Sequence, residues 1–260
     1  MKTIVLERHR RQTAIITITN TAKQNAFDAQ LLRELGEKLD AVERDSTYRV
    51  LYLRGAGDRA FSTGVFLKDL VAFSSTSRAR DFAVLLESTM DRLYNFPKPV
   101  IALIHGYALG GGFGLALSSD LRIMTADAKI GFPAVKIGAI LPPGCTERLI
   151  SLVGAGYTKE LLLTGRYVAA DEALRTGLVN YTVRDTAALV QKADELAGSI
   201  MEGSPHALFM TKNTINSRTN DLIARHALYS PDNFAYLSST HDWQERISRF
   251  LRRKKTGGKK

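Results

Sequence analysis

Apolar residues in the first half of the chain follow two spacings, which together predict strands alternating with helices. Thr13–Thr19 is rich in β-branched residues and predicts a strand, with Thr3–Glu7 as its hairpin partner. Asp28 is suited to cap the helix that follows. Apolar residues then recur at helical spacing, at Leu31, Leu32, Leu35, Leu39 and Val42.

The same alternation continues toward the middle of the chain. Arg49–Arg54 is a short apolar run that predicts a buried strand, and a helix expected over residues 78–94 ends before Phe96–Pro99. Val100–Ile104 predicts the next strand, and Leu121–Met124 predicts another after a glycine-rich segment. This order predicts a mainly parallel, layered α/β core.

From Thr146 onward the spacing of apolar residues predicts successive helices, and the region from about Ser204 has little strand signal. We therefore divide the chain into an α/β core, residues 1–203, and a C-terminal helical region with a basic tail, residues 204–260. The second region is expected to act as a lid or an oligomer contact. No internal repeat is found in the sequence.

Composition favours a cytoplasmic protein. No run of 18 apolar residues occurs, which argues against a transmembrane helix, and charge near the N-terminus argues against a secretory signal. A single cysteine, Cys145, excludes an internal disulfide and suits a reducing compartment. With no motif around it, Cys145 is interpreted as a small packing residue.

The net charge of +10 raises the hypothesis of nucleic-acid binding, but the charge is unevenly distributed. Six positive charges lie between Arg252 and Lys260, so the rest of the chain carries only +4. No basic surface interleaved with aromatic residues accompanies the tail. We therefore do not expect nucleic acid as a partner.

Four glycines lie within the five residues Gly110–Gly114, between an apolar strand pattern and an apolar helix pattern. Such a segment leaves backbone N–H groups free at a helix N-terminus, where they can bind an anion or a developing oxyanion. The lysine of a P-loop and a full dinucleotide fingerprint are missing. Close packing of a strand against a helix is the simpler alternative. The glycines alone therefore do not distinguish an anion-binding site from close packing.

A second glycine-containing turn, in the segment Arg59–Leu70, follows the preceding strand. Together the two segments resemble the crotonase superfamily, also called the enoyl-CoA hydratase/isomerase family. The resemblance spans nearly the whole chain. Its motifs occur in family order at Asn25–Phe27, Ala60–Gly64, Pro99–Gly112, Ser119–Arg122, Lys136–Gly138 and Leu163–Arg166.

The resemblance implies a crotonase-like fold, a spiral β-β-α core with a C-terminal helical trimerisation region, and hence a homotrimer or hexamer. It also implies a CoA thioester whose carbonyl oxygen lies between the backbone N–H groups of Val65 and Gly111. These groups would stabilise the enolate, and losing one such donor typically costs on the order of 10²–10³ in rate.

Coenzyme A would enter as part of the substrate, with no tightly bound cofactor. By the same resemblance its contacts are expected at Lys23, Asn25, Ala26, Phe27, Phe66, Leu67 and Lys68. Lys68, or a cation of the tail of a neighbouring subunit, is a candidate partner for a phosphate.

The sequence departs from the resembled hydratases at the positions of their two glutamates. Gly114 stands at the first and Ala134 at the second. An acid used by some isomerases is also missing near Pro142. Hydration needs groups that activate water and deliver a proton to carbon, which neither glycine nor alanine can do.

Other titratable residues are candidates for this role. Glu87 falls where a related dehalogenase carries an active-site histidine and is the first candidate base. Asp69 and Asp91 are weaker candidates. His105 is expected to pack, whereas His226 and His241 lie in the C-terminal helices. No Cys/His/Asp cluster has the spacing of a metal site.

Three functions follow. The first is an acyl-CoA enzyme of fatty-acid metabolism, a lyase or isomerase with decarboxylase-like or isomerase-like chemistry; a hydratase with relocated acid–base residues is its variant. The second is a catalytically silent acyl-CoA carrier. RNA binding through the tail is the least favoured.

Overall fold

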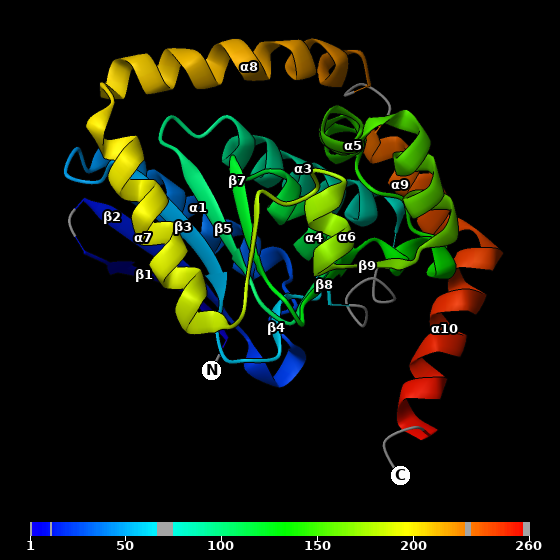
Figure 1. The fold of residues 1–260 in the computed structure, drawn as a ribbon. Coiled ribbons are helices and arrows are strands. Elements are labelled where there is room, and N and C mark those ends of the chain that lie inside the picture. Colours follow the sequence, from blue (N-terminus) through cyan, green and yellow to red (C-terminus); the bar gives the residue numbers. More distant parts are fainter. Residues whose placement is uncertain (1, 11, 67–74, 227–229, 257–260) are drawn as a thin grey trace.

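The strands form two sheets in the computed structural model, which describes residues 2–10, 12–66, 75–226 and 230–256 (Figure 1). The larger sheet has the order β1 (Thr3–Arg8), β2 (Thr13–Thr19), β3 (Val50–Gly55), β5 (Val100–Ile104), β7 (Leu121–Thr125) and β10 (Tyr181–Val183). Only β1 and β2 pair antiparallel in it. The smaller sheet has the order β4 (Ala60–Ser62), β6 (Tyr107–Leu109), β8 (Lys129–Gly131) and β9 (Tyr167–Ala169).

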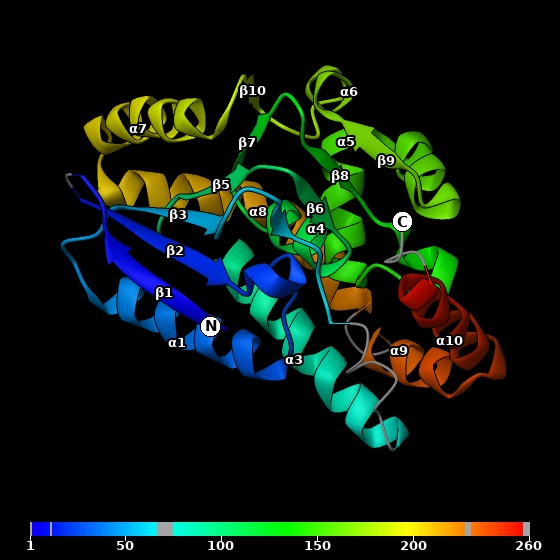
Figure 2. The same cartoon turned by 90° about the horizontal axis from the view of Figure 1, so that it is seen from below.

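Helices cover both faces of the larger sheet, with α1 and α3 on one side and α7 on the other (Figure 2). The α-helices are α1 (Ala29–Arg44), α3 (Thr76–Tyr94), α4 (Gly111–Leu117), α5 (Pro143–Thr164), α6 (Ala170–Arg175), α7 (Thr186–Glu202), α8 (Pro205–His226), α9 (Ser230–Ser239) and α10 (His241–Thr256). Two 3₁₀ turns are η1 (Thr21–Lys23) and η2 (Pro133–Ile137).

Strand β3 shows why the larger sheet is apolar on both faces. Leu51 and Leu53 point into the cluster that contains α1 and α3, whereas Val50 and Tyr52 point into the cluster that contains Leu189 of α7. Successive side chains of a strand point to opposite faces, so a strand between two helical layers reads as an unbroken apolar run. The predicted crotonase-like α/β fold class is confirmed.

Several local predictions are also confirmed. Asp28 caps α1, accepting a hydrogen bond from the backbone N–H of Leu31 at 3.0 Å. β1 and β2 form the expected antiparallel pair. His105 and Cys145 are buried, as packing residues should be.

The prediction of helices alone after Thr146 is wrong at two places. β9 joins the smaller sheet beside β8, and β10 extends the larger sheet beside β7. Each has three residues, too few to show a period of two, so pairing with distant strands decides their conformation. Helix α5 has a break at Gly154, where φ is +77°.

Helices α8, α9 and α10 form the C-terminal region. Helix α8 lies across one end of the molecule and α9 lies beside α3 (Figures 1 and 2). Trp243 of α10 packs against the backbone of Gly138. A functional division at residue 203 stays a prediction, although α8 begins at Pro205. Within the described residues, no helix combines the length and apolar character needed to span a bilayer.

A buried ion pair attaches α8 to the core. Lys212 donates to a carboxylate oxygen of Asp120 at 2.7 Å, and the same oxygen accepts the backbone N–H of Val100 at 2.7 Å. Burial raises the pKa of Asp120 and lowers the pKa of Lys212. The pair therefore stabilises α8 only while both partners are present.

Lys212→Met is expected to reduce the free energy of unfolding by about 3–5 kcal/mol at neutral pH, because it leaves a buried carboxylate unpaired. Since burial raises the pKa of Asp120 in the folded protein, its protonation favours folding at low pH, and that contribution is lost as pH rises through the folded pKa. Urea denaturation should therefore show a smaller loss at about pH 4 than at neutral pH. Equal losses of stability at both pH values would contradict this account. So would a double variant, Asp120→Asn/Lys212→Met, that loses as much stability as Lys212→Met alone.

Candidate active site

Two backbone turns meet at glycines that leave no room for side chains. Gly64 follows β4 with φ at +85°, and Gly110 precedes α4 with φ at +57°. A Cβ on Gly64 would lie 2.4 Å from the backbone nitrogen of Gly111. The close approach of the two turns thus requires glycine, both for its conformation and for its size.

Phe27 holds the first turn in place. Its backbone N–H donates to the carbonyl of Gly64 at 2.8 Å, and its own carbonyl accepts from Phe66 at 2.9 Å. Its ring lies so close to Gly111 that a Cβ there would be 2.6 Å from the ring. Phe27 therefore fixes the distance between the turns that carry Val65 and Gly111.

The N–H groups of Val65 and Gly111 have no hydrogen-bond acceptor within the described part of the chain. Both residues line one large cavity of about 1530 Å³. Gly111 is the first residue of α4, so its N–H is one of the groups that a helix leaves unpaired at its start. The two groups form a pair of donors available to an oxygen atom in the cavity.

Both cationic and apolar residues line the cavity. Within the described part of the chain, the cationic ones are Lys23, Arg59, Lys136, Arg246 and Arg249. Much of the apolar lining comes from α3, η2 and the segment after it, α9 and α10, including Ala83, Leu86, Ile137, Ala139, Ile140, Phe234, Phe250 and Leu251. Such a lining suits a ligand that carries both anionic and apolar groups.

The residues predicted to contact coenzyme A fall into three groups. Those that line the cavity are Lys23, Ala26 and Phe66. Asn25 and Phe27 are buried beneath it, with the Asn25 side chain donating to the carbonyls of Ala56 and Ala60 at 2.8 and 2.7 Å. Leu67 and Lys68 lie outside the described residues, as does Asp69.

Glu87 is the one acidic residue among the described residues that line the large cavity, and no histidine is among them. It comes from α3, and it also lines a second cavity of about 20 Å³ together with Asp91. The tertiary fold thus brings Glu87 into the cavity that Val65 and Gly111 line, which the sequence pattern did not establish.

Gly114 and Ala134 have different surroundings. A Cβ on Gly114 would lie 2.6 Å from Cε and 2.9 Å from Sδ of Met90, so the methionine fills this space. Ala134 and Pro142 line the large cavity. Gly114 and Ala134 have no group that can accept or donate a proton.

Gly114→Ala is expected to cost about 1 kcal/mol of stability, because the added methyl displaces the buried but flexible Met90 side chain. In the double variant with Met90→Ala, the methyl occupies vacated space, so the two costs should not add. Urea denaturation of the four proteins of this cycle provides the measurement. Additive losses would show that Met90 does not fill the space beside Gly114.

The other described titratable candidates are not among the residues that line the large cavity. Burial lowers the pKa of His105, which favours a neutral ring. Burial raises the pKa of Cys145 to about 11, so this thiol is not an activated nucleophile. His241 is exposed at the start of α10, and the His226 side chain lies outside the described residues. In the described part of the chain, no three His, Cys, Asp or Glu side chains gather to hold a metal.

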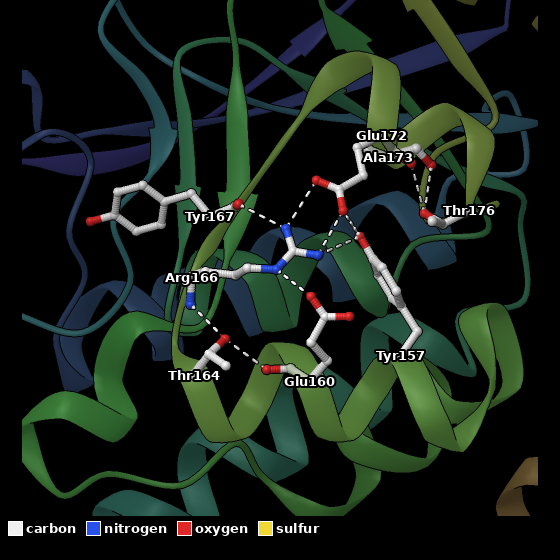
Figure 3. A network of polar contacts seen from close by, with 8 residues as sticks. All are labelled: Tyr157, Glu160, Thr164, Arg166, Tyr167, Glu172, Ala173 and Thr176. Atoms are coloured by element: carbon white, nitrogen blue, oxygen red, sulfur yellow. Dashed lines mark hydrogen bonds and ion pairs between the residues drawn. The ribbon is translucent and has the colours of Figure 1, made fainter.

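A network of hydrogen bonds and ion pairs centres on Arg166 (Figure 3). Arg166 donates to Glu160 at 2.7 Å and to Glu172 at 2.6 Å, and the Tyr157 hydroxyl donates to Glu172 at 2.8 Å. Hydrogen bonds to Glu172 raise the pKa of Arg166 further. The network joins α5, β9 and α6, and β9 carries Tyr167 of the cavity lining.

Comparisons with known proteins agree with this geometry. Residues 8–258 match the family model described as Enoyl-CoA hydratase/isomerase. The chain is 33% identical over 258 residues to the short-chain-enoyl-CoA hydratase of Clostridium acetobutylicum, covering 99% of this chain and 98% of the relative. It is 36% identical over 203 residues to the carnitinyl-CoA dehydratase of Escherichia coli K12, and the match covers 78% of this chain and 77% of the relative.

Solved structures show the same fold. The enoyl-CoA hydratase of Bacillus halodurans has a TM-score of 0.88 at 26% identity, covering 95% of this chain and 99% of that one. Human mitochondrial delta3-delta2-enoyl-CoA isomerase has a TM-score of 0.90 with 98% of each chain covered. Because this structure is only 22% identical to the chain in sequence, the comparison shows similarity of fold alone.

Proposed function

The chain belongs to the enoyl-CoA hydratase/isomerase family, and from this premise we propose that it moves a proton at the carbon next to the thioester of an acyl-CoA, shifting a double bond. Glu87 is the acid–base group of this proposal. The observation that carries it is the position of Glu87 as the one acidic residue among the described residues of the large cavity.

The oxyanion hole of the proposal consists of the N–H groups of Val65 and Gly111. Removing a proton from the carbon next to a thioester places negative charge on the thioester oxygen. Two donors that are already fixed in position stabilise this charge without reorganising during the reaction. The contact between Gly64 and Gly111 and the hydrogen bonds of Phe27 hold these two donors in position.

One carboxylate suffices for a double-bond shift. Glu87 takes a proton from C2 of a 3-enoyl-CoA, and the electron pair of that C–H bond forms the enolate. The enolate then takes the proton back from Glu87 at C4, which leaves the double bond between C2 and C3. The carboxylate ends in its starting state, so no second acid is needed.

The rival reactions fit this lining less well. Water addition needs groups that orient and deprotonate water, and Gly114 and Ala134 supply none. Decarboxylation of a malonyl-type thioester would place the carboxylate of the substrate near that of Glu87, and like charges at short range repel. A single carboxylate beside an oxyanion hole therefore favours isomerisation.

Cationic residues of the cavity lining are proposed to bind the phosphates of coenzyme A, which enters with the substrate. Lys23 lies over the Phe66 ring, with Nζ 5.4 Å from the ring centroid, so its charge is held at the cavity. Arg59 and Lys136 line the same cavity. The contact of Lys68 with a phosphate stays a prediction.

We also propose that the chain forms a homotrimer or hexamer through its C-terminal region. Helix α8 exposes Met210 and Ile215, which are 60% and 67% accessible. Burying such apolar side chains in a subunit contact would be favourable. Light scattering coupled to size-exclusion chromatography tests this, and a monomer at micromolar concentration would contradict it.

The deciding experiment offers the protein 3-enoyl-, 2-enoyl- and malonyl-type CoA thioesters and follows products by mass spectrometry. We expect conversion of 3-enoyl-CoA to 2-enoyl-CoA to be the fastest reaction. Faster water addition would instead indicate a hydratase with relocated acid–base residues. Tight binding without any turnover would indicate a carrier.

A further inference from the structure

Glu87 also lines a second, small cavity. This cavity has a volume of about 20 Å³ and shares Glu87, Pro142 and Pro143 with the large cavity. The volume has room for one water molecule, and the carboxylates of Glu87 and Asp91, which both line it, are two polar partners for such a water. Glu87 therefore belongs both to the lining of the large cavity and to that of a space where one water fits.

Asp91 lines the same small cavity as Glu87. It lies four residues after Glu87 on α3, which places both side chains on one face of the helix. Its side chain is 41% exposed, so it also reaches solvent. Asp91 is thus in contact both with the small cavity and with the outside of the protein.

A buried arginine fixes the Asp91 carboxylate. Arg148, whose side chain is 2% exposed, forms an ion pair with Oδ1 of Asp91. Its guanidinium also donates to the Ser118 hydroxyl at 2.8 Å, and this hydroxyl donates to the carbonyl of Gly114 at 2.8 Å. The contacts tie Asp91 to α4, the helix that begins at Gly111.

We propose that Asp91 is a proton relay that exchanges the proton of Glu87 with solvent through one water in the small cavity. The inference rests on the proposed function, because it needs Glu87 to receive a proton from the substrate. Asp91 acts through Glu87 and does not touch the substrate.

The relay conserves protons. After the first step Glu87 is a carboxylic acid, and it gives its proton to the water while the water gives one of its own to Asp91. Glu87 becomes a carboxylate again, and the protonated Asp91 releases its proton to solvent. Run in reverse, the same path delivers a solvent proton to Glu87, so the proton added at C4 need not be the one removed from C2.

The test is isomerisation of a 3-enoyl-CoA in D₂O, with deuterium at C4 of the product measured by mass spectrometry at low conversion. In the wild type, deuterium should appear in a substantial share of the product. In Asp91→Asn, deuterium per turnover should fall at least about fivefold, because an amide cannot accept the proton. Asp81→Asn, an exposed change on the same helix, is the matched control.

Gly144→Ala provides a second variant that leaves the Asp91 carboxylate chemically unchanged. Its added Cβ would lie 3.1 Å from Oδ1 of Asp91, 3.6 Å from Nη2 of Arg148 and 3.7 Å from Cδ1 of Ile223, so it narrows the small cavity that Asp91 and Ile223 line. The methyl should exclude the water and lower deuterium per turnover as Asp91→Asn does, while Asp91→Glu should retain exchange.

The outcomes separate the two proposals. Unchanged deuterium per turnover in Asp91→Asn or in Gly144→Ala overturns the relay alone, as does wild-type turnover without any incorporation. If Asp91→Asn lowers turnover but leaves the ratio of deuterium to turnover unchanged, Asp91 has a structural role only. This result also overturns the relay. Absence of isomerisation by the wild type overturns the proposed function, and the relay with it.

Discussion

Glu87→Gln is expected to lower the turnover number for 3-enoyl-CoA isomerisation by on the order of 10²–10⁴, the usual contribution of a general base. The glutamine amide keeps the size of the side chain but cannot take the proton from C2. Affinity for the acyl-CoA should change little, because the loss falls on the transition state. Steady-state kinetics with a direct binding measurement provides the test.

Glu37→Gln is the matched control for this variant. Glu37 is an exposed residue of α1 and is not among the residues that line the cavity, so the same chemical change should leave turnover as in the wild type. If Glu87→Gln retains more than about a tenth of wild-type turnover, Glu87 is not the base and the proposed one-carboxylate mechanism is wrong.

Gly64→Ala is expected to cost on the order of 10²–10³ in turnover, because it displaces a donor of the proposed oxyanion hole. Its Cβ would lie 2.4 Å from the backbone nitrogen of Gly111 and 2.8 Å from the carbonyl oxygen of Leu109. Since both atoms belong to the backbone, the two turns must move apart. The positive φ of Gly64 adds strain of about 1 kcal/mol or more.

Gly36→Ala separates this effect from a general response to alanine. Gly36 lies inside α1 with nothing within 4 Å of an added Cβ, so the change should stabilise the protein by about 0.5–1 kcal/mol without altering turnover. Denaturant unfolding distinguishes lost folding from lost chemistry. Wild-type kinetics in a well-folded Gly64→Ala protein would remove Val65 and Gly111 from the mechanism.

The names of the relatives leave the reaction open. A hydratase that is 33% identical over almost the whole chain establishes the family, but a shared fold accommodates different chemistry when site residues differ. In this chain, residues 114 and 134 are glycine and alanine, and the acidic residue of the described cavity lining comes from α3 instead. Measuring three reactions side by side is therefore more informative than measuring hydration alone.

The sequence by itself determined the elements whose signals are local. The β-branched run at Thr13–Thr19, the Asp28 cap and the apolar run at Val100–Ile104 each predicted an element that the structure contains. The glycines at positions 64 and 110 marked the two turns, because few other residues adopt their backbone conformation. Such signals survive in sequence because they depend on neighbours a few residues away.

Only the tertiary structure decided which residues meet. The three-residue strands β9 and β10 exist because distant strands pair with them. Glu87 and Asp91 look like ordinary polar positions of an amphipathic helix, yet they line the cavities beside α4 and α5. Met90 fills the space beside Gly114, a contact that no spacing along the chain reveals. These facts depend on packing between segments far apart in sequence, and local propensity contains no information about them.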